Sequence, residues 1–156
     1  MLKKYGKGDV LVIPVGEENV ALGQIVEKLR GGNVLLAVFS ELLKTSDTVE
    51  VEKQRLDDPV FLVETMDLRI KEGAWRVAGN REVSSVIPSP VYKVWVEPPG
   101  EFRTQDIHGT VGGPVGADEA AKLKLQKSFS PAVVETALRA LHGFSPWRSA
   151  FDELAI

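Results

Sequence analysis

The pattern of hydrophobic residues changes along the chain, from short apolar runs to a helical repeat. Residues 10–15 and 34–39 form apolar runs of strand length, and residues 20–29 form a longer segment between them. Short turn signals separate the three segments, and Gly31-Gly32-Asn33 is a strong hairpin signal. The pattern therefore predicts a three-stranded antiparallel meander at the start of the chain.

The pattern is looser in the segment that follows. Residues 40–44 could form one helical turn, and the period-two alternation of residues 49–52 indicates a half-exposed edge strand. Residues 66–72 could form a short helix that ends at Gly73. Three further apolar segments are predicted to be strands: residues 60–63, 75–78 and 91–96.

The C-terminal part has turn signals of another kind. Glycine and proline are concentrated in residues 107–117, which predicts a surface loop. Ser130-Pro131 combines an N-cap residue with a first-turn proline, and Gly143 lies where a helix C-cap would place it. Ser145-Pro146 repeats the start signal, and apolar residues at helical spacing follow each start. We therefore expect a hairpin of two helices.

These elements predict one α+β domain, mostly β, over residues 1–156. We expect a β body over residues 5–106, a glycine-rich loop over 107–117 and C-terminal helices over 130–155. The body would be a small antiparallel sheet or an SH3-like, partly open barrel, with the helical hairpin packed on it. A chain of 156 residues can bury a stable core without disulfides or metal.

Composition removes several classes of function. The chain has no cysteine and two histidines, so we expect no disulfide, thiol nucleophile, metal site or cofactor. The apolar runs are far shorter than the roughly 20 residues of a membrane helix, so no membrane association is expected. The basic start has no apolar region behind it, which favours the cytoplasm. A net charge of −3 makes nucleic-acid binding less favoured.

Candidate catalytic motifs are weak in this sequence. The glycine-rich stretch lacks the Gly-Lys-Ser/Thr ending of a phosphate loop, because Pro114 follows Gly113. Asp106 and His108 could form an acid–base pair, although no nucleophile is identifiable and solvated loop residues explain them more simply. His142 falls in the last turn of a predicted helix, where a cation suits the helix dipole. We therefore expect no enzyme activity.

Other residues are candidates for binding a protein partner. Trp95 alternates with Lys93 along its predicted strand, so its ring could be partly exposed and anchor an interface. The acidic turns could engage a basic partner surface: Glu17, Glu18, Asp57 and Asp58. Trp75 and Trp147 are expected to pack in the core or to anchor the last helix.

Two segments together carry a family resemblance. One begins with Gly8-Asp9-Val10 and continues through Ile13-Pro14 to a strand containing Gly23; the other is residues 73–80, with glycines on either side of a tryptophan. In this order and spacing they resemble the immunity protein 26 family of bacterial polymorphic toxin systems. The resemblance covers about residues 6–95. It implies seven motif residues with mainly structural roles: Gly8, Asp9, Pro14, Gly23, Gly73, Trp75 and Gly79.

The resemblance implies a protein that neutralises a cognate toxin by binding and occlusion, in the cytoplasm and without catalysis. A basic nuclease is the kind of toxin that the acidic balance would suit. An SH3-like adaptor that binds nucleic acid or another macromolecule is the alternative, and an enzyme using Asp106 and His108 is a third. Basic residues gathered beside exposed aromatic rings would favour nucleic acid: Lys3, Lys4, Lys7, Lys28 and Arg30.

Overall fold

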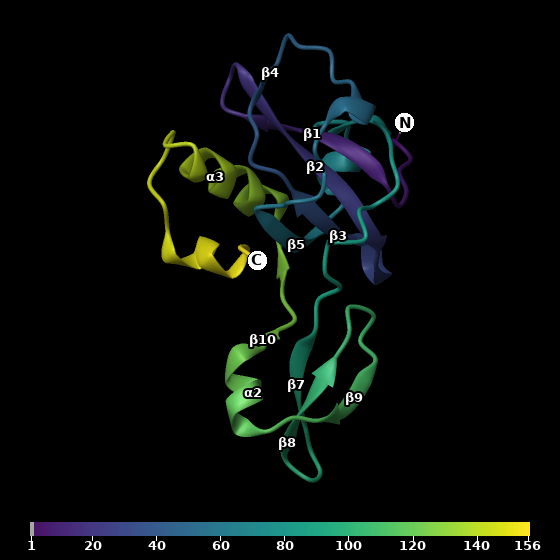
Figure 1. Ribbon diagram of the computed structural model, residues 1–156, viewed down its shortest axis with the longest axis vertical. Coiled ribbons are helices and arrows are strands. Elements are labelled where there is room, and N and C mark those ends of the chain that lie inside the picture. The colour runs from purple at the N-terminus through teal and green to yellow at the C-terminus, as the bar shows by residue number, and fades with distance from the viewer. Residues whose placement is uncertain (1) are drawn as a thin grey trace. The chain divides into compact units, whose positions relative to one another are not determined.

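The computed structural model describes residues 2–156 and divides into two compact units (Figure 1). The first unit comprises the chain up to Ile87 together with residues 128–156, and the second comprises residues 88–127. Each unit contains one open sheet, so neither is a closed barrel. The expectation of an α+β fold that is mostly β is confirmed.

A seven-stranded sheet forms the first unit, with the main order β11-β5-β3-β2-β1-β6 and with β4 paired to the start of β2. Its pairs are antiparallel except for the short β11, which runs parallel to β5. The strands are β1 (Asp9–Val15), β2 (Asn19–Lys28), β3 (Asn33–Val38), β4 (Leu43–Lys44), β5 (Phe61–Met66), β6 (Arg76–Asn80) and β11 (Ser128–Phe129).

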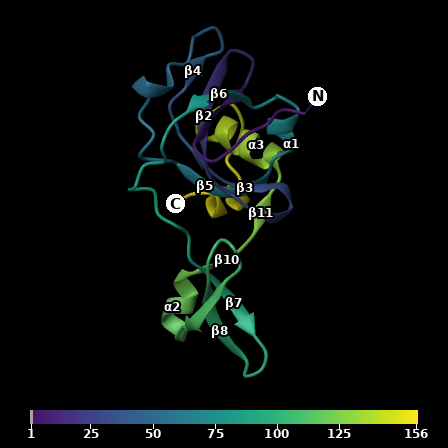
Figure 2. The same ribbon diagram turned by 90° about the vertical axis from the view of Figure 1, so that its right-hand side faces the viewer.

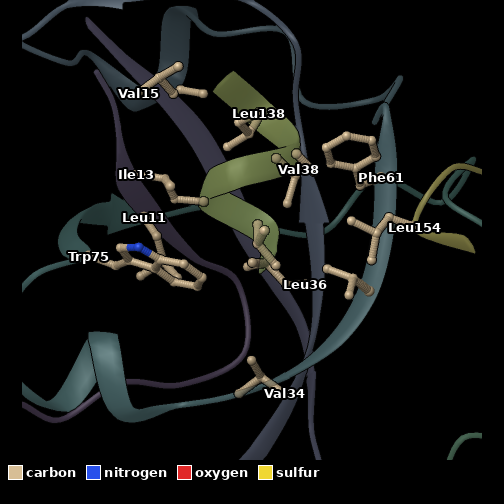
Figure 3. Packing of buried hydrophobic residues seen from close by; sticks show 14 of the residues in the cluster. Leu11, Ile13, Val15, Val34, Leu36, Val38, Phe61, Trp75, Leu138 and Leu154 are labelled. Carbon is tan, nitrogen blue, oxygen red and sulfur yellow. The ribbon is translucent and has the colours of Figure 1, made fainter. Parts of the chain in front are cut away.

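Both faces of this sheet are buried, which explains why β1 and β3 have continuous apolar sequences instead of alternating ones. Leu11 and Ile13 point to a core shared with helix α3 (Pro131–Leu141), whose Val134, Ala137 and Leu138 are fully buried (Figure 3). The odd and even positions of β1 alternate between two clusters. The second cluster, on the other face, comprises Val10, Val12, Val20, Leu22, Ala37, Phe39, Val51, Leu56 and Ile87.

Helix α3 begins and ends where its sequence signals predict. Pro131 occupies the first turn, and Gly143 follows the helix with φ of +78°. The amide of Phe144 donates to the carbonyl oxygen of Arg139, which is the bond of a Schellman C-cap. The predicted second helix is present as a short 3₁₀ helix, η3 (Ser149–Glu153).

The loosely patterned segment after β3 differs from the prediction. Part of residues 40–44 is strand β4, and residues 49–52 contain no strand but enter the 3₁₀ helix η2 (Val51–Lys53). Val51 is buried and packs against Gly79. Burial of this side chain favours the 3₁₀ helix over the edge strand that the alternating pattern predicted. The 3₁₀ helix η1 (Arg30–Gly32) lies at the predicted hairpin turn. The short helix predicted over residues 66–72 is confirmed as α1 (Leu68–Lys71).

The second unit contains a four-stranded sheet of order β10-β7-β8-β9 and one helix (Figure 2). Only Ile107 and Ala120 of its residues are buried. The prediction of a loop over 107–117 is wrong for its centre, which pairs with β8 as a strand. The elements are β7 (Tyr92–Val96), β8 (Glu101–Gln105), β9 (Val111–Pro114), α2 (Ala117–Lys122) and β10 (Lys124–Leu125).

Within residues 2–156, no helix has both the length and the apolar character that crossing a bilayer requires.

Candidate functional site

Charge is unevenly distributed over the first unit, and strand β2 runs between two regions of opposite sign. Acidic residues gather where β2 begins at Asn19, and basic residues gather where it ends at Lys28. The nine steps between these residues correspond to roughly 30 Å of extended chain. That distance is several Debye lengths at physiological salt, so the two regions act as separate surfaces.

The acidic end, as we name the first region, joins the β1–β2 turn to residues 41–47 and 55–58. The amide of Thr45 donates to the carbonyl oxygen of Glu18 at 2.8 Å, and β4 pairs with β2 at Asn19 and Val20. Lys44 and Arg55 are the basic residues within it. Its six acidic residues are all exposed: Glu17, Glu18, Glu41, Asp47, Asp57 and Asp58.

Arg55 lies among these carboxylates. Its Nε donates to Asp57 Oδ1 at 2.9 Å, and this hydrogen bond, the charge of Asp57 and the charge of Asp58 raise the pKa of the guanidinium. Arg55 therefore leaves most of the acidic charge uncompensated. A basic partner would meet a surface with a formal charge of −4, from six acids and two bases.

The acidic end also contains a shallow hollow with a volume of about 10 Å³, room for about one water molecule. Four apolar side chains form much of its wall: Leu22, Phe39, Leu43 and Leu56. Glu41, Gln54 and Arg55 complete the lining. The hollow is therefore too small to admit a side chain, and a partner would contact the acidic end across its surface.

The basic end, as we name the second region, surrounds a nearly buried carboxylate. Tyr5 Oη donates to Asp67 Oδ2 at 2.5 Å, and Lys71 Nζ lies 3.1 Å from the same oxygen. The ammonium of Lys28 lies 4.6 Å from the centre of the Tyr5 ring. Burial and the bond to Asp67 raise the pKa of Tyr5.

The N-terminal segment brings further lysines to this end. The amide of Lys3 donates to the carbonyl oxygen of Lys71 at 3.0 Å, and Lys7 pairs with Glu27 at 3.5 Å. Six basic residues belong to the basic end: Lys3, Lys4, Lys7, Lys28, Arg30 and Lys71. Three acids accompany them, Glu27, Asp67 and Glu72, so the formal charge is +3.

The exposed large hydrophobic residues at the basic end are aliphatic: Leu2, Met66 and Leu68. The five basic residues named from the sequence do gather, but within the described chain no exposed aromatic ring accompanies them. Single-stranded nucleic acid is commonly bound by stacking on such rings. The expected signature of nucleic-acid binding is therefore only half present.

Gly8 and Asp9 of the resembling motif lie at the junction of β1 and β6. Gly8 has φ of +87°, and a Cβ there would lie 2.7 Å from the carbonyl oxygen of Arg81. The carboxylate of Asp9 accepts from the amide of Gly6 and from Asn80 Nδ2. Buried Gln24 donates from Nε2 to the carbonyl oxygens of Gly8 and Arg81. These contacts tie the start of β1 to the end of β6.

Two other motif glycines allow close packing. A Cβ at Gly23 would lie 3.0 Å from Ile13 Cδ1, and one at Gly79 would lie 2.9 Å from Val51 Cγ2. Of the other motif residues, Trp75 is 1% exposed in the core, Pro14 is exposed in β1, and Gly73 follows α1 with φ of +82°. The motif residues are thus distributed through the first unit and do not converge on one site.

Trp95 lies in the second unit, where half of its surface is exposed. Its ring meets Phe102 edge-on at 4.9 Å, and its Nε1 donates to Glu97 Oε1. The ring is therefore held in place while one side stays open to solvent. Trp147, by contrast, belongs to the first unit and packs edge-on against Phe151.

Asp106 and His108 do not form an acid–base pair. Asp106 Oδ1 accepts from the backbone amides of His108 and Thr110, and these bonds, that to Thr110 foremost, lower the pKa of the carboxyl. The carboxylate therefore closes the β8–β9 turn and does not orient the imidazole. Across residues 2–156, no three histidine, aspartate or glutamate side chains are grouped to hold a metal ion.

The sequence analysis identified the acidic turns but left out Glu41 and Asp47. It named five of the six basic residues of the basic end and left out Lys71. Glu41 and Asp47 were missed because residues 40–44 were not assigned to a strand beside β2. The cluster of lysines at positions 3, 4 and 7 was visible, and the missing information was which residues the N-terminal segment contacts.

The first part of the chain matches a known protein family. A family model described as Immunity protein 26 matches residues 6–97, which is more than half of the chain. The matched region begins just before β1 and ends just after β7. No curated protein matches this chain, and no solved structure does. The resemblance found in the sequence is thus confirmed, and the chain belongs to the immunity protein 26 family.

Proposed function

We propose that this protein neutralises a cognate bacterial toxin by binding it and covering its working surface, without catalysing a reaction. The observation that carries this proposal is the family match over residues 6–97. The engagement of Asp106 by backbone amides, and the small volume of the hollow at the acidic end, agree with a binding role. The proposed place of action is the cytoplasm of the producing cell.

We assign the toxin contact to the acidic end. Its six exposed acids include the four residues singled out in the sequence: Glu17, Glu18, Asp57 and Asp58. The partner would then present lysine or arginine side chains, as a basic nuclease does. Complementary charge speeds association and rejects acidic competitors, while apolar contacts slow dissociation. A stable complex would bury about 1,200–2,000 Å² in total.

Trp95 is the candidate contact in the second unit. A half-exposed tryptophan that neighbouring groups hold in one position suits an interface anchor, because little side-chain entropy is lost on binding. Trp95 and the acidic end lie in different units, so each is tested by its own variant.

The test uses a candidate toxin taken from the reading frames next to the gene for this chain. Wild-type protein co-expressed with that toxin should restore growth and co-purify with it. Reversing charge with Glu17→Lys, Glu18→Lys and Asp58→Lys should weaken binding on the order of 100-fold or more, mainly by slower association. The matched control, Glu52→Lys, Glu72→Lys and Glu82→Lys, makes the same change in net charge at exposed positions outside the acidic end.

The proposed function fails if wild-type protein neither restores growth nor binds any toxin encoded beside it. The assignment of the contact fails separately, if the acidic-end variant binds as tightly as the control variant. Trp95→Ala should weaken binding about tenfold or more if Trp95 is an anchor. An unchanged affinity would remove the second unit's tryptophan from the interface.

A further inference from the structure

The two ends of β2 are complementary to each other as well as opposite in charge. The acidic end has a formal charge of −4 and an apolar-walled hollow, and the basic end has a charge of +3 and three exposed aliphatic side chains. Both belong to one compact unit. The ends cannot meet within one chain because strand β2 separates them.

We infer that the basic end of one copy of this chain docks on the acidic end of a second copy. The occupant is a second copy because the chain itself supplies a surface of complementary charge. Lysines 3 and 4 would face the carboxylates of Glu17 and Glu18, and the second copy would cover the exposed Leu2, Met66 and Leu68. Burying apolar surface adds to the attraction between charges.

The geometry of the contact determines how association proceeds. Two different surfaces meet, so the interface is heterologous, and each added copy leaves one acidic end and one basic end free. The apparent mass should therefore keep rising with concentration and should not level off at a dimer. Association should be weak, because exposed charge pairs contribute little each and are screened by salt.

This inference goes beyond toxin binding but has a consequence for it. Self-association would cover the acidic end, which is the surface proposed for the toxin. Toxin and second copy would then compete, and addition of toxin would dissociate the assembly. The inference itself needs no toxin, so its failure would leave the proposed function untouched.

Sedimentation velocity on the full chain tests the inference. At about 50 mM salt the wild-type mass should rise with concentration, and about 500 mM salt should weaken association on the order of tenfold. One variant neutralises the acidic end with Glu17→Gln, Glu18→Gln and Glu41→Gln. The other neutralises the basic end with Lys3→Gln, Lys4→Gln and Arg30→Gln. Circular dichroism and thermal unfolding confirm that both variants are folded.

Each variant alone should remain a monomer, because one of its two surfaces is disabled. A mixture of the two should form one-to-one complexes and stop there, because each variant keeps the surface that the other needs. Wild-type protein that stays monomeric at low salt would overturn the inference. So would association that persists in either variant alone, or a mixture that does not associate. If wild-type protein is monomeric but the basic end binds an oligonucleotide, its partner is nucleic acid instead.

Discussion

At the scale of single residues, Tyr5 shows how a polar contact holds the N-terminal segment on the body of the first unit. Its hydroxyl donates to Asp67, and Asp67 is held in turn by Lys71 and by the backbone of Gly32. The Asp67 carboxylate is nearly buried, so an unpaired oxygen there would be costly. The segment that carries Lys3 and Lys4 to the basic end therefore depends on this phenol.

Tyr5→Phe should lower the free energy of unfolding by about 1 kcal/mol, since one hydrogen bond to a charged acceptor is lost and Lys71 still pairs with Asp67. The measurement is chemical denaturation near neutral pH. Tyr5→Leu is the companion variant, because it also removes the ring beneath Lys28 and should cost more. Equal stability of wild type and Tyr5→Phe would show that the bond contributes nothing net.

The raised pKa of Tyr5 predicts a loss of stability in alkali. The folded state holds the phenolic proton more tightly than the unfolded state, whose pKa is near 10.0. The contribution of Tyr5 is therefore complete below pH 10 and declines as the pH rises further. Denaturation midpoints measured on both sides of pH 10 should fall more steeply for wild type than for Tyr5→Phe. Parallel profiles for the two proteins would contradict the coupling.

Gly8 is the motif residue whose backbone conformation is most demanding. Its positive φ and the 2.7 Å approach to the Arg81 carbonyl oxygen both oppose a side chain. Gly8→Ala should lower the free energy of unfolding by about 2 kcal/mol or more. Gly16→Ala is the matched control, because Gly16 has φ of +72° with open space around it and should cost about 1 kcal/mol. Equal losses would show that the close approach is unimportant.

At the scale of elements, strand β9 contains two adjacent glycines, Gly112 and Gly113, that differ in the space available for a side chain. A Cβ at Gly112 would overlap Thr104 Oγ1 in the neighbouring strand, whereas one at Gly113 would meet open space. Gly112→Ala should therefore destabilise the second unit, and Gly113→Ala should be neutral or slightly stabilising. Hydrogen exchange of the β8 and β9 amides measures both effects locally. A larger effect at Gly113 would contradict the described register.

The same strand shows where prediction from sequence stops. Strands β1, β2 and β3 were predictable because continuous apolar runs and a glycine turn specify them locally. Strand β9 has two glycines and a proline among its four residues, which is a loop composition, and only pairing with β8 makes it a strand. Residues 49–52 show the opposite error, since burial of Val51 overrode an alternating pattern.

The candidate site could also be predicted only in part from the sequence. The acids at positions 17, 18, 57 and 58 were recognisable because they occupy turns. Their assembly into one acidic end was not predictable, because it depends on the pairing of β4 with β2, two strands that are distant in sequence. The partial exposure of Trp95 was expected from the sequence and is observed. That Trp95 lies in a separate unit could be seen only from the contacts within the folded chain.

At the scale of the whole molecule, the two units differ in how much core each contains. Both buried clusters belong to the first unit, whereas the second has two buried residues, Ile107 and Ala120, among its 40. A unit of that size seldom folds alone without disulfides or metal. The acidic and basic ends also belong to the first unit. The larger unit therefore contains the surfaces assigned here, except Trp95.

A shortened chain tests this division, with Ile87 joined to Ser128 through a flexible glycine–serine linker in place of residues 88–127. The first unit should still unfold cooperatively, because its two clusters are intact, and it should keep its salt-sensitive self-association. The isolated segment 88–127 should show little structure by circular dichroism.

If the shortened chain also binds toxin as tightly as the full chain, the acidic end suffices. If binding falls to the same degree as in Trp95→Ala, the second unit contributes through that tryptophan. A shortened chain that fails to fold would show that the second unit supports the first, contrary to the distribution of buried residues.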